Sequence, residues 1–279
     1  MDQIVEEQTY GFIGGGNMAS SLISGLIASG HSPEHLWVSD INAETLKALA
    51  ENLKVNTSVS NDTIINEVDV VVFAVKPQTL SDVAKSAAAA IKEKKSLIVS
   101  IAAGISQQSL TDWLGADAAI VRCMPNTPAL VLTGATALHA NAKVSAEQRS
   151  LAENIMRSVG IALWVKDESD LDAVTAVSGS GPAYFFLLME AMEKAAVELG
   201  LTEETARLLV QQTALGAAKI ALESSESPEQ LRKRVTSPGG TTQQAITTFE
   251  QGGFTELVSK ALHAARDRSI EMSKPSEQN

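Results

Sequence analysis

The chain has 279 residues, 44% of them hydrophobic, which is enough to bury one large core or two ordinary ones. A formal net charge of -11, with no dense run of Lys or Arg, argues against nucleic acid or an anionic membrane surface as a partner. The single cysteine, Cys123, excludes an internal disulfide framework and fits a reducing compartment. Residues 1–8 carry acidic residues and no apolar run of the secretory type, and no segment is apolar for long enough to span a bilayer. We therefore predict a cytoplasmic protein.

Short apolar runs alternate with helical patterns in the first half of the chain. Strands covered on both faces are predicted at 9–13, 36–39, 68–75, 97–101 and 119–122, with later strands at 135–139 and 161–165. Helices are predicted between them at 18–28, 43–52, 79–91 and 146–158. This alternation predicts a parallel sheet built from βαβ units.

The pattern changes after about Lys166, where helices follow one another without a strand candidate. We predict an α/β protein of two domains, with residues 1–165 holding the sheet and residues 166–279 all helical. Helices are expected at 182–199, 203–222, 229–235, 243–250 and 254–270, followed by a disordered tail at 274–279.

The helix that begins at Pro182 is apolar all round from Ala183 to Met189, whereas a surface helix has a polar face. It is either the central helix of its own domain or a helix buried between two subunits. A domain of about 110 residues has little mass of its own to cover such a helix. We favour burial between the subunits of a two-fold homodimer and leave open whether dimers assemble further.

A glycine-rich loop follows the first predicted strand and opens the first predicted helix. Its residues, Gly14-Gly15-Gly16-Asn17-Met18-Ala19, satisfy G-x-G-x-x-G/A, in which the first glycine makes the turn and the second admits a pyrophosphate. The small third residue, Ala19, packs helix on strand. Asp40 ends the second strand 21 residues later. This order predicts a Rossmann dinucleotide-binding domain.

Asp40 also bears on which dinucleotide binds. Its carboxylate would accept hydrogen bonds from a ribose 2′-OH and repel a 2′-phosphate. Ile41, Asn42 and Ala43 offer no arginine to hold such a phosphate. These residues favour NADH over NADPH.

Three further segments follow strands, at the edge where this kind of fold binds its ligands. They are Ala74-Val75-Lys76-Pro77, Ile101-Ala102-Ala103-Gly104 and Met124-Pro125-Asn126-Thr127-Pro128. Their small residues and prolines suit rigid walls beside a nicotinamide, and ordinary strand-to-helix turns are an equal alternative.

The segment Thr236-Ser237-Pro238-Gly239-Gly240-Thr241-Thr242, here called the anion clasp, joins two predicted helices. Thr241 and Gln244 have the spacing of a capping box, so the second helix is expected to begin at Thr241 or Thr242 with unpaired N–H groups. These donors, the glycines and the hydroxyls of Ser237 and Thr242 predict binding of a carboxylate or phosphate. The alternative is a plain turn between helices.

Other reactive side chains carry weaker signals. His31 and His35 have helical metal spacing but flank a proline and lack a third ligand, so no metal site is predicted. His139 and His263 are interpreted as structural or exposed, and Cys123 as a packing residue rather than a nucleophile.

Taken together, the motifs resemble the pyrroline-5-carboxylate reductase family over nearly the whole chain. The matching segments are Gly-Gly-Gly-Asn-Met-Ala at 14–19, Val-Lys-Pro at 75–77, Asn-Thr-Pro at 126–128, Ser-Gly-Ser-Gly-Pro-Ala-Tyr at 178–184 and Ser-Pro-Gly-Gly-Thr-Thr at 237–242. The resemblance implies NAD(P)H-dependent reduction of 1-pyrroline-5-carboxylate to L-proline, the last step of proline biosynthesis. It also implies a Rossmann domain and an all-α C-terminal dimerisation domain that interlocks with a partner's, so that the substrate site forms at the dimer interface.

The resemblance further implies which residues bind the ligands. Cofactor contacts fall on Ile13, Gly14, Gly15, Gly16, Asn17, Met18, Asp40, Asn61, Ala74, Val75, Lys76, Pro77, Ile101, Ala102 and Ala103. Substrate contacts fall on Glu168, Ser237, Gly240, Thr241 and Thr242. The chain departs from some family members, which have serine at the position of Asp40 and asparagine at that of Arg234.

The chemistry explains why no acid–base side chain stands out. A protonated cyclic imine already accepts hydride readily, so the protein mainly has to hold its carbon against the nicotinamide and fix its carboxylate. We assign the carboxylate to Ser237 and to the N–H groups of residues 240–242. The Thr242 hydroxyl is assigned to the ring nitrogen, as an orienting group or proton donor.

Two other functions stay open. A 3-hydroxyacid dehydrogenase of similar build would have a catalytic lysine early in the helix after Gly181, but the first lysine there is Lys194. The second alternative is a dinucleotide-binding sensor without catalysis.

Overall fold

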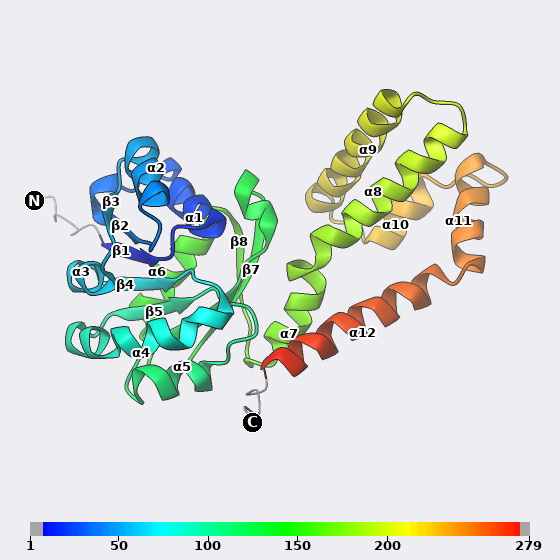
Figure 1. Ribbon diagram of the computed structural model, residues 1–279. Helices are drawn as coiled ribbons and strands as arrows, with labels where there is room; N and C mark the ends of the chain where they lie inside the picture. Colours follow the sequence, from blue (N-terminus) through cyan, green and yellow to red (C-terminus); the bar gives the residue numbers. More distant parts are fainter. Residues whose placement is uncertain (1–7, 274–279) are drawn as a thin grey trace, which may run out of the picture. The chain divides into compact units, whose positions relative to one another are not determined.

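The computed structural model describes residues 8–273, so the predicted tail at 274–279 and nearly all of the acidic segment at 1–8 lie outside the described residues. Two compact units are distinguished (Figure 1). The sheet unit comprises the described residues up to Ser180 together with those from Ala265, and the helical unit is Gly181–Ala264. The units therefore divide at residues 180 and 264. The division into domains at residue 165 stays a prediction.

The sheet unit is built on one eight-stranded sheet with the order β3-β2-β1-β4-β5-β6-β7-β8. All neighbouring strands pair in parallel except β6 and β7, which are antiparallel. This sheet confirms the predicted Rossmann-like fold. The strands are β1 (Tyr10–Ile13), β2 (Leu36–Ser39), β3 (Asn56–Ser58), β4 (Val70–Phe73), β5 (Leu97–Ser100), β6 (Ile120–Met124), β7 (Gly134–Ala140) and β8 (Gly160–Trp164).

Helices cover both faces of the sheet (Figure 1). Because successive side chains of a strand point to opposite faces, Phe12 packs in one core cluster and Ile13 in the other. The first cluster holds α1 (Asn17–Ala28), α2 (Ala43–Leu53) and α6 (Ala146–Arg157) against the sheet. The second holds α3 (Asn61–Glu67), α4 (Pro77–Lys94) and α5 (Gln107–Leu114).

The elements of the sheet unit that were absent from the sequence prediction include β3, α3 and α5. Strand β3 is a three-residue edge strand of polar Asn-Thr-Ser, so it has no apolar alternation to reveal it. Helices α3 and α5 have only seven and eight residues, and each begins after a serine cap, Ser60 and Ser106. Two short 3₁₀ turns have a proline in their first two positions, η1 (Pro33–His35) before β2 and η2 (Thr127–Val131) after β6.

The sheet unit ends in a helical connection. Helix α7 (Asp170–Val174) runs into a π-helical turn, η3 (Thr175–Gly179). The last residues of α12 (Phe254–Ser273) also belong to this unit, where the Ser269 hydroxyl donates to Asp172 Oδ1 at 2.7 Å.

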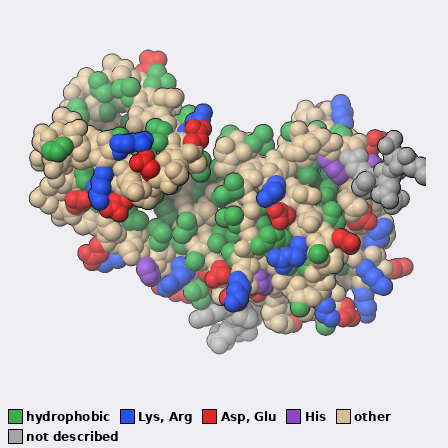
Figure 2. Space-filling model, turned by 180° about the vertical axis from the view of Figure 1, so that it is seen from behind, with side chains coloured by type: hydrophobic (Ala, Val, Ile, Leu, Met, Phe, Trp, Pro, Cys, Tyr) green, Lys and Arg blue, Asp and Glu red, His purple; other side chains and the backbone are tan. Residues whose placement is uncertain are grey.

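The helical unit contains α8 (Gly181–Glu198), α9 (Glu203–Glu223), α10 (Pro228–Arg234), α11 (Thr241–Gln251) and the first part of α12. As predicted, α8 ends before Gly200, which has φ +99°, and Thr202 caps α9. Among the described residues of this unit, only Gly181, Ala206 and Val210 are buried. Apolar side chains are consequently visible at the surface (Figure 2).

Candidate dinucleotide and anion sites

The glycine loop after β1 has the geometry that its pattern predicts. Gly14 has φ +102°, and a Cβ there would lie 2.8 Å from Ala74 O, so the position requires glycine. A Cβ on Gly16 would meet nothing within 4 Å, so the backbone there faces open space. Ala19 is buried against the core. The first glycine therefore makes the turn, and the second leaves room for a ligand.

Helix α1 begins at this loop without a side-chain cap. Its N-cap is Gly16, and its first turn contains no acidic residue. Helix α4, which follows β4, also begins uncapped, after Lys76. By contrast, a side-chain oxygen caps each of α2, α3, α5, α6, α9 and α10. The free N–H groups and positive dipole end of α1 suit a pyrophosphate.

Asp40 lies beside the glycine loop. Its Oδ2 accepts a hydrogen bond from Gly15 N, and its Oδ1 accepts one from Asn42 N, both at 2.8 Å. Asn42 in turn caps α2, whereas the side chain of Ile41 is fully exposed. The negative charge of Asp40 is thus fixed at the end of β2, next to the first two glycines.

Asn61 joins the same edge through Ser39. The Ser39 hydroxyl donates to Asn61 Oδ1 at 2.7 Å, and Ser39 O accepts from Gly14 N at 2.8 Å. Asn61 is the first residue of α3, which sequence patterns did not reveal. The structure therefore brings together the glycine loop, Asp40 and Asn61.

The ends of β4 and β5 continue this edge. Ala74 N donates to Ile13 O at 2.9 Å, and Ile101 N donates to Phe73 O at 3.2 Å, so each chain leaves the sheet beside its neighbour. Ala102 is buried, and Gly104 turns the chain with φ +72°. Val75, Lys76, Pro77 and Ala103, also predicted to bind the cofactor, keep part of their surface accessible.

The loop after β6 is fixed by Asn126. This nearly buried side chain accepts from Ala135 N at 2.8 Å and donates to Ser178 O at 3.0 Å. It therefore ties the loop both to β7 and to the π-helical turn.

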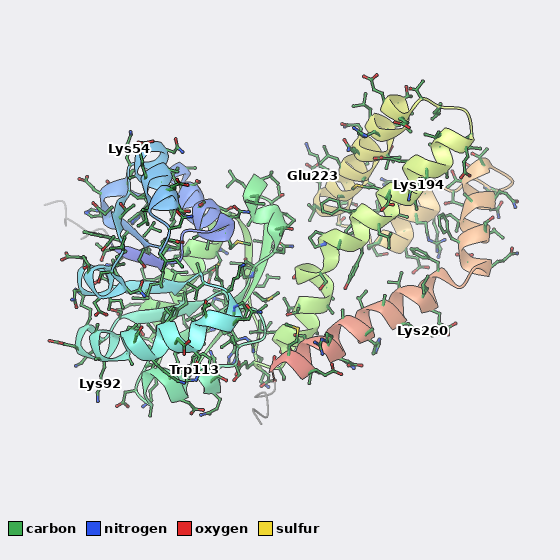
Figure 3. All side chains as sticks on the ribbon, viewed as in Figure 1. Lys54, Lys92, Trp113, Lys194, Glu223 and Lys260 are labelled. Atoms are coloured by element: carbon green, nitrogen blue, oxygen red, sulfur yellow. The ribbon has the colours of Figure 1, made fainter. Side chains whose placement is uncertain are left out.

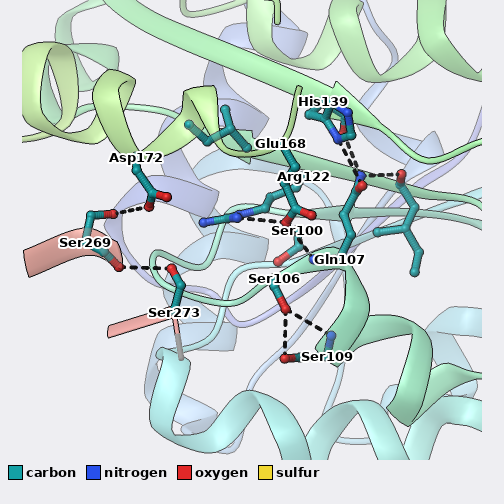
Figure 4. Close-up of polar contacts among 12 residues, drawn as sticks. Ser100, Ser106, Gln107, Ser109, Arg122, His139, Glu168, Asp172, Ser269 and Ser273 are labelled. Carbon is teal, nitrogen blue, oxygen red and sulfur yellow. Dashed lines mark hydrogen bonds and ion pairs between the residues drawn. The ribbon is translucent and has the colours of Figure 1, made fainter. Parts of the chain in front are cut away.

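Glu168 lies in a partly buried polar network (Figure 4). Its Oε1 accepts from Arg122 Nη1 at 2.8 Å and from Gln107 N at 2.7 Å. Gln107 Nε2 donates to the carbonyl oxygens of Ile120 and His139, and Gln107 Oε1 pairs with His139 Nδ1 at 2.9 Å. Sequence patterns did not single out Arg122 or Gln107 as site residues. An arginine inside an apolar strand was the available signal, because buried arginines are almost always paired.

In the helical unit, the anion clasp joins α10 to α11. Helix α11 begins at Thr241, as predicted, but the capping-box prediction was wrong. The N-cap is Gly240 without a side-chain cap, since the nearby glutamine that bonds is Gln243, whose Oε1 accepts from Gly239 N. Gly239 has φ +72°.

The donors of the clasp are exposed. Gly240 N donates to Ser237 O at 3.1 Å, so it is used within the turn. Within residues 8–273, no acceptor bonds the N–H groups or hydroxyls of Thr241 and Thr242, or the Ser237 hydroxyl. At the end of α10, the Arg234 guanidinium pairs with Glu226. The clasp thus presents neutral donors at an uncapped helix start.

The remaining reactive side chains are engaged elsewhere. Cys123 is buried within β6, and burial raises the pKa of its thiol, which fits packing rather than nucleophilic attack. His263 Nδ1 bonds Ser259 O. In the part of the chain that the structure describes, no His, Cys, Asp and Glu group could hold a metal ion, and no helix could cross a membrane.

Lys194 lies within α8 (Figure 3). Its ammonium donates to Glu190 one turn earlier, and this hydrogen bond raises the pKa of Lys194. The first turn of α8, where the dehydrogenase alternative requires a lysine, is Gly181-Pro182-Ala183-Tyr184.

Two models of known protein families match this chain, one in each half. Residues 168–272 match the family model described as pyrroline-5-carboxylate reductase dimerisation, and residues 9–104 match that described as NADP oxidoreductase, coenzyme F420-dependent.

Similar proteins extend along nearly the whole chain. A pyrroline-5-carboxylate reductase of Pseudomonas aeruginosa is 53% identical over 261 residues, covering 94% of this chain and 95% of that protein. The solved pyrroline-5-carboxylate reductase of Coxiella burnetii is 47% identical with a TM-score of 0.93, covering 97% of this chain and 100% of that one. The Plasmodium falciparum pyrroline carboxylate reductase, solved with NADP bound, is 31% identical with a TM-score of 0.85, covering 96% and 99%. The chain belongs to the pyrroline-5-carboxylate reductase family.

Proposed function

We propose that this chain reduces 1-pyrroline-5-carboxylate to L-proline with a nicotinamide dinucleotide. The observation that carries the proposal is the anion clasp, an uncapped helix start with neutral donors, in a chain of this family. A carboxylate suits such donors, and an imine substrate explains why the clasp needs no strong acid or base.

The glycine loop fits the dinucleotide. Gly16 leaves open space at the uncapped start of α1, where backbone donors would hold the pyrophosphate. The other proposed contacts are Ile13 to Met18, Asp40, Asn61, Ala74 to Pro77 and Ile101 to Ala103. When bound, the dinucleotide supplies the hydride.

Asp40 supports a preference for NADH. Its carboxylate is held in place by Gly15 N and Asn42 N, so it cannot turn away cheaply from a 2′-phosphate. A 2′-hydroxyl would instead donate to it.

The clasp is proposed to fix the substrate carboxylate. Because Gly240 N already bonds Ser237 O, the available donors are the N–H groups of Thr241 and Thr242 and the Ser237 hydroxyl. This revises the assignment to the N–H of Gly240, which contributes by allowing close approach. The Thr242 hydroxyl orients the ring nitrogen or supplies its proton, and Glu168 is proposed as a further substrate contact.

The dimerisation model over residues 168–272 supports a homo-oligomer. We propose a two-fold dimer in which α8 is buried. Phe185, Phe186 and Leu187 on this helix are 65%, 64% and 66% exposed in the single chain, which is unusual for consecutive large apolar residues.

Turnover assays test the function. Oxidation of NADH on adding 1-pyrroline-5-carboxylate, with proline as the product, is expected. Oxidation only in the presence of a 3-oxoacid would favour the dehydrogenase alternative, and dinucleotide binding without any turnover would favour the sensor.

Thr242→Ala tests the proposed role of the clasp. Loss of a group that contacts the reacting ring should lower kcat by about tenfold or more while the Kd for NADH stays unchanged. Thr248→Ala, further along α11, is the matched control. An unchanged kcat in Thr242→Ala would remove this hydroxyl from the mechanism.

A further inference from the structure

Arg122 is a buried charge in the middle of the sheet. It lies on β6, paired in register with Ser100 of β5 and His139 of β7, and its side chain is 6% exposed. Removing a guanidinium from water is costly unless a partner compensates it. Its one ion-pair partner among the described residues is Glu168, 46 positions later in the chain.

The Glu168 carboxylate is held by one oxygen only. Arg122 Nη1 and Gln107 N both donate to Oε1, and no described group donates to Oε2. The Glu168 side chain is 27% exposed. Two donors from different elements thus fix the direction of the carboxylate and leave its second oxygen available.

Gln107 gives this arrangement a rigid base. It is the first residue of α5, and its buried amide bonds the main chain of both β6 and β7. The Gln107 N–H that reaches Glu168 is therefore fixed to the same two strands as Arg122 (Figure 4).

A purely structural pair would take another form. Arginine binds a carboxylate most strongly through two parallel hydrogen bonds that use both oxygens. Here a buried arginine engages one oxygen of a partly exposed acid. The arrangement orients the acid more than it neutralises it.

We propose that Arg122 is a positioning residue, which holds the Glu168 carboxylate so that its Oε2 meets the substrate. This inference rests on the proposed function and on Glu168 as a substrate contact. Arg122 acts through Glu168 and touches neither ligand.

A double-mutant cycle tests this role, with Arg122→Met, Glu168→Gln and the double variant. Arg122→Met should raise the KM for 1-pyrroline-5-carboxylate by about tenfold and change the Kd for NADH by less than about twofold. Arg122→Lys should recover part of the loss. Because Arg122 acts through Glu168, the double variant should be no worse than Glu168→Gln alone.

Arg149→Met is the matched control, since Arg149 contacts the Trp164 ring at 3.9 Å and no carboxylate of the network. It should leave the substrate KM unchanged. If Arg122→Met does not fold, Arg122→Gln, which also removes the charge, replaces it in the cycle with the same two outcomes.

Additive effects of the two substitutions, or an unchanged KM in Arg122→Met, would overturn the inference about Arg122. The proposed function would still stand in that case, provided that the wild-type protein turns over the substrate. Absence of wild-type turnover would instead overturn the proposed function itself.

Discussion

The two units differ in how they treat their apolar side chains. In the sheet unit, large side chains such as Phe12, Phe73 and Ile98 are fully buried between the sheet and its helices. In the helical unit, Phe185, Phe186 and Leu187 remain mostly exposed. The sheet unit thus has a complete core of its own, whereas the helical unit needs another surface to cover α8.

The units also share a feature. Helices α2, α3, α5, α6, α9 and α10 begin with a capping side chain, and α1, α4, α7 and α11 do not. The starts of α1, α4 and α11 lie in the segments proposed to bind the dinucleotide and the substrate. A missing cap leaves backbone donors that a ligand can use.

The largest expected effect concerns the exposed face of α8. Phe186→Asp should convert the proposed dimer to a monomer and lower turnover by more than about a hundredfold, because a carboxylate cannot be buried there unpaired. Size-exclusion chromatography with light scattering and the turnover assay measure both. Phe186→Leu is the apolar control. A Phe186→Asp dimer with full activity would show that α8 is not at the interface.

Two glycines of the glycine loop have different roles, since Gly14 is required by the fold and Gly16 is proposed to make room for the ligand. Gly14→Ala should destabilise the protein by about 2 kcal/mol or more, because alanine disfavours the left-handed backbone and its Cβ meets Ala74 O. Gly16→Ala should have the same free energy of unfolding as the wild type. It should bind NADH much more weakly. Denaturant titration and NADH binding distinguish them. If the two substitutions destabilised the protein equally, a methyl group would not fit freely at Gly16, and the proposed ligand space there would be wrong.

Asp40 tests cofactor preference. Asp40→Asn keeps an oxygen that accepts from Gly15 N but removes the charge, so NADPH binding should gain about tenfold relative to NADH, or about 1.4 kcal/mol. Fluorescence titration with both dinucleotides measures the ratio. A wild-type enzyme that already prefers NADPH strongly would refute the argument from Asp40.

The smallest effect separates capped from uncapped helices. Ser145 and Gln148 form a capping box at the start of α6, so Ser145→Ala should cost about 1 kcal/mol of stability. The kinetic constants should not change, because this helix start is not a proposed ligand site. Thermal unfolding and steady-state kinetics provide the test. A changed KM would contradict the view that capped helix starts take no part in ligand binding.

The features that could be predicted from the sequence depend on neighbouring residues, and those that were missed depend on contacts between residues far apart in the chain. The glycine loop, the start of α11 and the apolar α8 were visible because each depends on neighbouring residues. The Glu168 network was not, since Gln107 and Arg122 lie 61 and 46 positions away. The capping box at Thr241 was predicted wrongly because Gln243, rather than Gln244, bonds within the turn.

The central claim is that the clasp binds a carboxylate of a cyclic imine. The most direct test compares 1-pyrroline-5-carboxylate with 1-pyrroline, which lacks the carboxylate, in the NADH oxidation assay. A site built to hydrogen-bond that group should reduce 1-pyrroline with a kcat/KM at least about a hundredfold lower. Similar kcat/KM values for the two imines would contradict it.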